Sequence, residues 1–426
     1  MSATITIVFF IVGLLGMPIA FALGFGSLVG LWMANVDANM LPQRMLHAIN
    51  SFPLMSIPFF MLAGELMIKA DIMPRLIEFA NAFVGRVRGG LGHATMIAAA
   101  GLSTVSGAAV ADASALSGTL IPELKKAYGL PFASAVVAAA ANLGPIIPPS
   151  GAMIVYALMA GPTVSIGGLF MAGVVPGLIL TTAMMGWVSY VAWKRDYPLS
   201  GAPFSFSHVF SVMRRSLIVF LMPVTVIGGI IGGAFTATEG SAIAVIYSML
   251  VGFFVTKKLK LSDMPDALLR AAITTAIVGA MIAFASTITF LFTIDNLPQQ
   301  LAVLIKGITS NPLIFNLIIA VMLFIVGTAM ESNAAYIMLV PLFHPIAMEY
   351  GLDPLHFGFL FVFNLVIGML TPPVAVVLMV VQGVSKVETK PFMKEVWPFV
   401  WVQYGVLLLC MLFPPVVTWL PRMMGY

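Results

Sequence analysis

In this chain of 426 residues, 61% of side chains are hydrophobic and 8% are charged, whereas soluble domains carry about 25% charged residues. Apolar runs of membrane-spanning length recur from end to end, so the composition predicts an all-α polytopic membrane protein. The net charge of +4 does not indicate a nucleic-acid partner, because the basic residues lie in short loops, as the positive-inside rule expects.

The first apolar run, residues 3–33, is interrupted at Gly16 and Pro18. As one helix it would span about 45 Å, against a hydrocarbon core of about 30 Å, so two short helices or one kinked helix would fit. We expect residues 1–70 to form scaffold helices and residues 71–90 to form an amphipathic connector. Glu65 precedes Lys69 by four residues and predicts a local ion pair.

A hairpin and a broken helix are predicted next. Residues 91–124 are too short for two full spans and a turn, which favours a re-entrant helical hairpin with its tip near Ser103–Gly107. The run 131–160 contains a glycine and three prolines between Asn142 and Ser150, and these prevent a continuous helix. In a membrane, the carbonyls freed there persist only inside protein or beside a wet cavity or ion site. Residues 91–165 therefore form the first hairpin-plus-break unit.

The same order of elements returns in the second half. Scaffold helices are expected over 166–294, and an amphipathic connector over 295–311. The second hairpin and broken helix occupy 312–385, with a tip near Gly327–Asn333 and a break at Asn364–Pro373. A last helix is expected within 386–426. Landmarks in matching order indicate an internal repeat: Asp112 precedes Pro122 by ten residues, and Glu331 precedes Pro341 by ten.

Loop charges predict that the two repeats are inverted. The loops around the first hairpin are basic, whereas those around the second hold Lys306 and several acids, namely Asp295, Glu349 and Asp353. The basic residues of the first set are Arg75, Arg86, Arg88, Lys125 and Lys126. By the positive-inside rule the first hairpin enters from the cytoplasm and the second from the opposite side. Inverted repeats with paired broken helices are typical of secondary transporters.

The tips and breaks offer oxygen ligands. Serine hydroxyls at the first tip and carbonyls near Gly144 form the hard, weakly charged set that a sodium ion needs. Thr328, Asn333 and Thr371 offer side-chain oxygens in the second half. Half-helix N-termini facing the centre would favour an anionic substrate. Candidate substrate contacts are Ser103, Asn142, Pro149, Ser150, Asn333, Asn364 and Pro372. Alternatively, the small residues merely permit close helix packing.

Intramembrane acids require their own explanation. Asp112 and Glu331 lie just past the two tips, where they would tune the ion sites or the hinge. The alternative for these acids is a partner such as Lys125 or a capped helix terminus. Glu239 is expected to cap a turn between two spans. No arginine is obvious in the central region of the expected fold, so recognition of a carboxylate would rely on helix N-termini and backbone amides.

An enzymatic function has little support in the sequence. The five histidines are scattered, no H-E-x-x-H pattern occurs, and the single cysteine, Cys410, excludes intrachain disulfides and cysteine-cluster metal sites. An intramembrane hydrolase built on Ser106 and Asp112 would lack a visible base beside the serine. We therefore expect neither an enzyme nor a cofactor.

Five motifs together resemble a known family essentially from end to end. They are Ser103–Asp112, Asn142–Ser150, Thr236–Glu239, Glu331–Asn333 with Pro341, and Asn364–Pro373. The chain resembles the large membrane subunit of tripartite ATP-independent periplasmic (TRAP) transporters, with the overall run most similar to the sialic-acid members.

The resemblance implies an inverted-repeat elevator transporter of the bacterial inner membrane that imports an organic acid anion, of the sialic-acid or C4-dicarboxylate type, with sodium. It implies a periplasmic binding protein and a separate small membrane subunit of four helices as partners. It also implies two sodium sites, although Glu331 stands where the first tip has a neutral residue. The first would use Ser103, Ser106, Gly107 and Gly144, and the second Gly327, Thr328, Asn333, Gly368 and Thr371. The alternatives are a stand-alone divalent-anion/sodium symporter and a non-transporting membrane scaffold.

Overall fold

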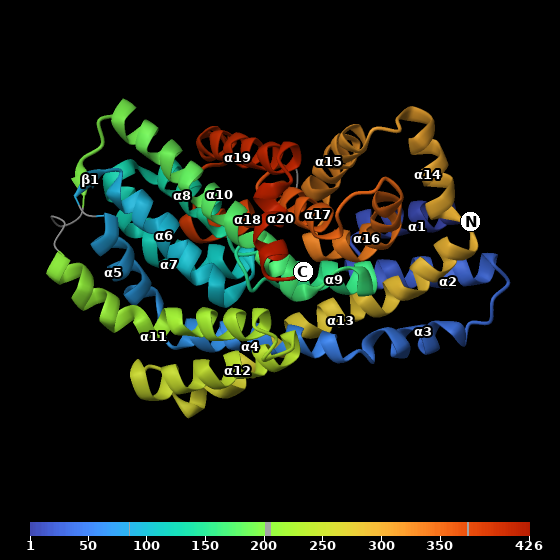
Figure 1. Cartoon of the computed structure of the whole chain (residues 1–426), viewed down its shortest axis with the longest axis horizontal. Coiled ribbons are helices and arrows are strands. Elements are labelled where there is room, and N and C mark those ends of the chain that lie inside the picture. Colours follow the sequence, from blue (N-terminus) through green and yellow to red (C-terminus); the bar gives the residue numbers. More distant parts are fainter. Residues whose placement is uncertain (85, 201–205, 373–374) are drawn as a thin grey trace.

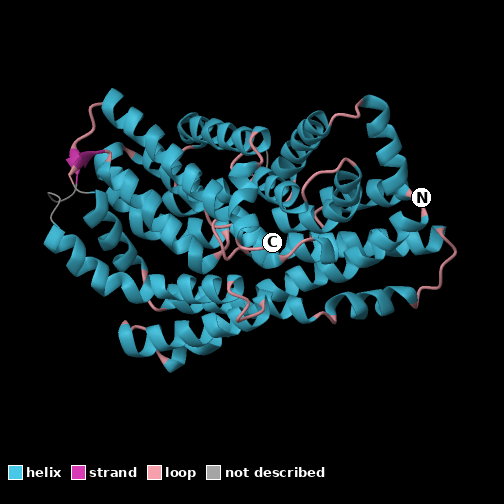
Figure 2. Cartoon of the chain, viewed as in Figure 1, coloured by secondary structure: helices cyan, strands magenta, loops and turns pink. Residues whose placement is uncertain are grey.

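The computed structural model describes residues 1–84, 86–200, 206–372 and 375–426, so Pro373 of the second predicted break lies outside the described residues. This part of the chain is helical apart from loops and one two-stranded antiparallel ribbon, in which β1 (Val87–Arg88) pairs with β2 (Leu199–Ser200) (Figure 2). The all-α expectation is confirmed.

The first half supplies ten α-helices in the described chain. They are α1 (Ser2–Leu14), α2 (Ile19–Met33), α3 (Met40–Ile49), α4 (Ser56–Lys69), α5 (Met73–Val84), α6 (Gly90–Ser106), α7 (Ala109–Tyr128), α8 (Leu130–Ala141), α9 (Gly151–Ala160) and α10 (Ile166–Lys194). Residues 3–33 thus form two short helices rather than one kinked one. Helices α6 and α7 form the first hairpin, and α8 and α9 are the halves of the first broken helix (Figure 1).

The second half repeats this order. Its helices are α11 (Phe206–Ile231), α12 (Ala237–Leu250), α13 (Met264–Ile294), α14 (Leu297–Ile308), α15 (Pro312–Ala329), α16 (Ser332–Glu349), α17 (Pro354–Gly368), α18 (Val376–Ser385), α19 (Thr389–Leu412) and α20 (Pro415–Met423). Helices α15 and α16 form the second hairpin, and α17 and α18 the second broken helix. Both predicted hairpins and both predicted breaks are therefore present.

Helix length separates the full spans from the half-length helices. In the described ranges, five helices are long and apolar enough to cross a membrane: Phe52–Lys69, Ile166–Lys194, Ala237–Val255, Leu261–Ile294 and Thr389–Leu412. The pair Leu297–Ile308 and Pro312–Thr328 passes the same test together but bends by 117°. The halves of both broken helices are shorter apolar helices, which suits segments that end at mid-membrane depth.

The two hairpin-plus-break units interlock reciprocally. The second helix of the first hairpin, α7, packs against α18, the second half of the other unit's broken helix. In the same way α16 packs against α9. This exchange is the packing expected of two related repeats. Helices α10 and α19 pack beside this pair of units, while α13 lies against α2, α3 and α4, and α12 against α4 (Figure 1).

Helix α12 begins with a reciprocal cap that follows the turn before it, as expected for Glu239. The Glu239 backbone N–H donates to Thr236 Oγ1 over 3.2 Å, and Glu239 Oε2 accepts from the Thr236 backbone N–H over 2.8 Å. This capping box satisfies two backbone donors that no helical carbonyl reaches.

Helix α1 is tied to the loop after α13 by Asp295. The Ser2 hydroxyl and backbone N–H donate to Asp295 Oδ2 over 2.6 and 2.8 Å. These hydrogen bonds hold the pKa of Asp295 below its ordinary value. Because the folded-state pKa is lowered, this stabilisation is present above the ordinary carboxyl pKa and is lost as the pH falls through the folded-state value.

We therefore expect Asp295→Asn to lower the thermal unfolding midpoint at neutral pH and to have a much smaller effect in acid below the ordinary carboxyl range. Thermal unfolding of the purified protein at both pH values measures this difference. A midpoint deficit of equal size at both pH values would show that the charge of Asp295 does not contribute.

Candidate transport site

The first hairpin tip lies directly against the first helix break. Helix α6 ends at Ser106, and its cap residue Gly107 has a φ of +60°, in the left-handed region. A Cβ atom at Gly107 would lie 2.7 Å from the carbonyl oxygen of Pro149, and one at Gly144 would lie 2.7 Å from Asp112 Oδ2. Side chains at these positions would collide, so glycine is what permits the approach of tip and break. Gly107 and Gly144 thus both lie where the first tip meets the first break.

Asp112 lies at the centre of this contact and is fully buried. The Ser106 hydroxyl donates to its Oδ1, and the Ser103 hydroxyl lies 3.3 Å from its Oδ2 and 2.7 Å from the carbonyl oxygen of Ala99. Among the described residues Asp112 forms no ion pair with Lys125, and its side-chain partners are the two serines, so the Lys125 alternative is wrong. A hydroxyl that donates its proton keeps lone pairs that can accept or coordinate. Ser103, Ser106 and Asp112 therefore form a buried, oxygen-rich group.

The first break satisfies part of its freed backbone internally. Ser150 caps α9: its hydroxyl accepts from the Met153 backbone N–H over 3.3 Å and donates to the Pro145 carbonyl over 2.7 Å. The peptide bond between Pro148 and Pro149 is cis. The carbonyl of Pro149 faces the tip at Gly107, as the glycine geometry shows. Freed carbonyls in a membrane are expected to find such protein partners.

The second tip closes on its break through two glycines. A Cβ at Gly368 would lie 2.6 Å from the Cα of Gly327, so α15 and α17 touch backbone to backbone. The hydroxyls of Thr328 and Thr371 donate to carbonyls of their own helices, Ile325 over 2.8 Å and Ile367 over 3.2 Å. Both threonine oxygens keep lone pairs.

Glu331 begins α16 as its N-cap. Its Oε2 accepts from the Ala334 backbone N–H over 3.2 Å, and its Oε1 accepts from Asn333 Nδ2 over 2.9 Å. The helix-cap alternative thus describes the contacts of this acid, and the two tips differ. Asp112 binds hydroxyls inside the first hairpin, whereas Glu331 binds the start of a helix.

The two asparagines of the breaks lie elsewhere. Asn142 Nδ2 donates to the Val366 carbonyl over 2.9 Å and to Gln403 Oε1 over 3.1 Å. Asn364 Nδ2 donates to the Ala320 carbonyl over 2.7 Å, and its Oδ1 accepts from the Tyr404 hydroxyl over 3.4 Å. Both amides are buried. Asn142 connects the first break to α17 of the second unit, whereas Asn364 connects α17 to α15 of its own unit and to α19. The structure does not bring either one to the lining of the cavity between the tips.

Between the tips lies a cavity of about 640 Å³. Both tips contribute to its wall, with Gly107 and Ala108 from the first and Glu331, Ser332 and Asn333 from the second. The breaks add Pro145, Gly151 and Met369. Helices α4 and α13 form the opposite wall. Of the predicted substrate contacts, Asn333 lines the cavity, whereas Ser103, Pro149, Ser150 and Pro372 lie at the tips and breaks without lining it.

The expectation that the central region lacks an arginine is wrong, because Arg270 of α13 lines this cavity. Arg270 Nε donates to Asp266 Oδ2 over 3.1 Å, and Lys69 Nζ reaches the same oxygen over 2.5 Å. Lys69 therefore pairs across to α13 rather than with Glu65, which also lines the cavity. The four-residue spacing of Asp266 and Arg270 was the available sequence signal. This spacing was not recognised as helical, because Asp266 and Arg270 lie at the border of the apolar run and resemble loop residues.

The chain is similar to known membrane transport proteins along nearly its whole length. Residues 6–416 match the family described as tripartite ATP-independent periplasmic transporter, DctM component. The chain is 36% identical over 414 residues to the sialic acid TRAP transporter large permease protein SiaM of Vibrio cholerae, covering 96% of each chain. It is 34% identical over 401 residues to the C4-dicarboxylate TRAP transporter large permease protein DctM of Pseudomonas aeruginosa, covering 94% of this chain and 93% of that protein.

Among solved structures, the YdaH transporter of Alcanivorax borkumensis matches with a TM-score of 0.66, 16% sequence identity and 90% coverage of both chains. This likeness concerns the fold alone. The family match and the relatives agree with the resemblance inferred from the motifs, and the described apolar helices fit a protein that crosses the membrane several times. The chain therefore belongs to the DctM family, the large membrane permeases of tripartite ATP-independent periplasmic transporters.

Proposed function

We propose that this permease imports an organic acid anion, delivered by a periplasmic binding protein, with sodium as the coupling ion and no ATP. The observation that carries the proposal is the cavity between the two hairpin tips, which has an oxygen-rich tip-and-break contact on each side. The binding-protein partner rests on family membership.

Two sodium ions would bind at the tip-and-break contacts. The first would use Ser103, Ser106 and backbone oxygens around Gly107 and Gly144, because tip and break approach to contact there. The second would use Thr328, Asn333, Thr371 and the backbone at Gly327 and Gly368. Hydroxyl and carbonyl oxygens suit a hard monovalent cation. Binding at such contacts would couple the ion to closure of each tip on its break.

The anion would occupy the cavity itself. Its volume of about 640 Å³ is within the range of about 300 to 1,000 Å³ common for small-molecule pockets, and a C4-dicarboxylate or a sialic acid is small enough for it. The N-terminus of α16, at Ser332, also opens onto the cavity, but the Glu331 side chain already caps that helix end, so the substrate anion needs another positive group. Arg270 supplies a cation on the facing wall. The relatives named for sialic acid and for C4-dicarboxylates support this substrate class.

Transport would follow an elevator motion. The interlocked units, 91–165 and 312–385, would move as one body against a scaffold that includes α4 and α13. Helices α10 and α19 pack against these units, so we assign them to the moving body rather than to the scaffold. The cavity lies at the boundary between the two bodies, which is where an elevator carries its substrate. A small four-helix membrane subunit would hold the scaffold in the inner membrane.

Uptake into proteoliposomes tests the proposal. The permease is reconstituted with its small subunit and binding protein, and uptake of a labelled organic acid is followed with sodium or potassium outside. We expect uptake to require sodium and the binding protein. Equal uptake in potassium would refute sodium coupling, and undiminished uptake without the binding protein would favour a stand-alone symporter. If no organic acid entered under any condition, a non-transporting scaffold would be favoured.

A further inference from the structure

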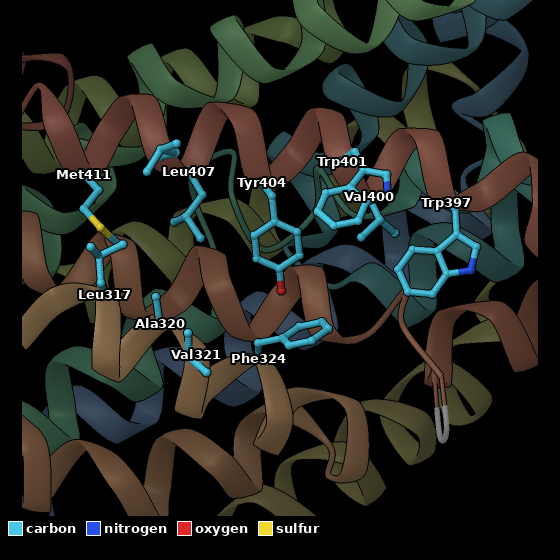
Figure 3. Close-up of a pocket in the computed structure, with 11 residues that line it drawn as sticks. Leu317, Ala320, Val321, Phe324, Trp397, Val400, Trp401, Tyr404, Leu407 and Met411 are labelled. Carbon is cyan, nitrogen blue, oxygen red and sulfur yellow. The ribbon is translucent and has the colours of Figure 1, made fainter. Parts of the chain in front are cut away.

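A second hollow lies on the other side of the second hairpin, between α15 and α19 (Figure 3). Its volume is about 240 Å³, and its walls are aliphatic and aromatic side chains. Phe324 and Leu317 rise from α15, and Trp397, Trp401, Tyr404 and Met411 project from α19 (Figure 3). This groove does not share lining residues with the cavity between the tips.

The lining residues of α19 continue into two lysines. Lys390, Lys394, Trp397, Trp401 and Tyr404 follow one another at intervals of three or four residues, which places them on one stripe of the helix. Both lysines are exposed, and neither takes part in an ion pair among the described residues. Trp397 and Trp401 are stacked with ring centroids 6.3 Å apart. Tryptophan is typical of the membrane–water interface, so the groove descends from a basic interface into the hydrocarbon.

The dimensions favour a lipid chain as the occupant. The rings of Phe324 and Tyr404, one from each wall, have centroids 5.5 Å apart, so the walls approach more closely than the width of about 10 to 12 Å that an α-helix with its side chains needs. A single acyl chain is far thinner. Along α19, Lys394 and Tyr404 are about 15 Å apart, which is about half of the hydrocarbon core and thus one leaflet. A phospholipid whose phosphate lies at the two lysines would place an acyl chain along the groove.

We propose that the groove between α15 and α19 binds an anionic phospholipid of the cytoplasmic leaflet, with the headgroup at Lys390 and Lys394 and an acyl chain against Trp397, Trp401 and Tyr404. The positive-inside rule places this lysine-bearing end of α19 at the cytoplasmic face. Basic pockets between transmembrane helices on that side bind anionic headgroups, and each lysine near the surface favours them.

The floor of the groove touches the second broken helix. The Tyr404 hydroxyl donates to Asn364 Oδ1 over 3.4 Å, and Asn364 Nδ2 holds the Ala320 carbonyl of α15 over 2.7 Å. Asn364 thus joins both walls of the groove to α17. An acyl chain in the groove would fill the space between α15 and α19. The lipid would thereby stabilise the contact of the second unit with α19 at the surface that faces the bilayer.

Quenching of tryptophan fluorescence tests this site directly. The full-length permease with its small subunit is reconstituted in phosphatidylcholine vesicles that contain a minor fraction of brominated phosphatidylglycerol or brominated phosphatidylcholine. We expect the phosphatidylglycerol to quench more strongly, and the excess to disappear in Trp397→Phe/Trp401→Phe. In Lys390→Gln/Lys394→Gln the preference for phosphatidylglycerol should fall on the order of tenfold.

The matched control is Lys257→Gln/Lys258→Gln, which removes two exposed basic residues away from the groove and should keep the full preference. Ala320→Phe should fill the groove and abolish the excess, whereas Ile325→Phe, on the same helix but outside the lining, should retain it. Equal quenching by both lipids would overturn the proposal. Excess quenching by phosphatidylglycerol that survives in Lys390→Gln/Lys394→Gln would also overturn it. So would excess quenching that is seen without the small subunit and is lost when that subunit binds, because a helix of the subunit would then occupy the groove.

Discussion

Replacing Gly107 with alanine is expected to reduce sodium-driven uptake at least tenfold in proteoliposomes while the permease still reaches the membrane. The new Cβ would lie 2.7 Å from the Pro149 carbonyl oxygen and 3.2 Å from the Gly151 nitrogen, both of them backbone atoms that a side-chain rotation does not relieve. The positive φ of +60° adds strain for any residue with a Cβ. Tip and break would be forced apart, and the oxygens around the first proposed ion site would separate with them.

Gly118→Ala is the matched control. Gly118 lies in α7 of the same hairpin, and a Cβ there would meet no atom within 4 Å. Alanine favours helices more than glycine by about 1 kcal/mol, so this variant should fold at least as well as the parent and transport normally. Normal uptake by Gly107→Ala would show that close contact between tip and break is not needed for transport. Loss of uptake in both variants would show that the hairpin is sensitive to any added methyl group.

The architecture of the hairpins and breaks was predictable because the chemistry that ends a helix is local. Three prolines and a glycine in Asn142–Ser150 interrupt any helix, whatever surrounds them. The length of residues 91–124 alone excludes two full spans. Helix breaks and hairpin length do not depend on which other helices the segment contacts, so the sequence alone predicts them.

Partners across the fold were not predictable in this way. Asn142 was expected near the substrate, yet its amide bonds to Val366 and Gln403, which are more than two hundred positions away in the chain. Lys69 was expected to pair with Glu65, but it bonds to Asp266 on α13. For Lys69, a suitable partner close in sequence is replaced by one that is closer in space. Local spacing identifies which polar groups need a partner, but only helix packing decides which partner they meet.

Arg270 illustrates the same limit for the cavity. Its sequence context resembles the end of a loop, and only the arrangement of α13 beside α4 and the two tips places it in the cavity wall. The internal repeat predicts two units with the same order of helices. The structure shows in addition that the units pack against each other reciprocally, α7 with α18 and α9 with α16. The second helix of each hairpin packs on the second half of the other unit's broken helix, so neither unit buries its apolar surface alone.

Asp112→Asn is expected to raise the sodium concentration for half-maximal uptake tenfold or more. The carboxylate accepts from the Ser106 hydroxyl and lies 3.3 Å from Ser103 Oγ. A sodium ion bound beside the tip would favour the ionised form of Asp112. An ionised carboxylate only accepts hydrogen bonds, so the serine oxygens would direct their lone pairs toward the proposed ion. Asparagine would present an amide N–H₂ to one serine and occupy its lone pair, and it would also remove a negative charge beside the cation. A tenfold loss corresponds to about 1.4 kcal/mol, which is modest for a buried charge.

Sodium titrations of uptake separate this role from a structural one. If Asp112 only held the hairpin together, Asp112→Asn would lower maximal uptake without shifting the sodium response. Asp71→Asn is the control: Asp71 is exposed and has a φ of +55°, which asparagine tolerates. Ser106→Ala should shift the sodium response in the parent but add little to Asp112→Asn, because the pair acts as one unit. An unchanged sodium response in Asp112→Asn would move the first ion site away from this tip, whereas coupled shifts would locate the ion beside the Ser106–Asp112 pair.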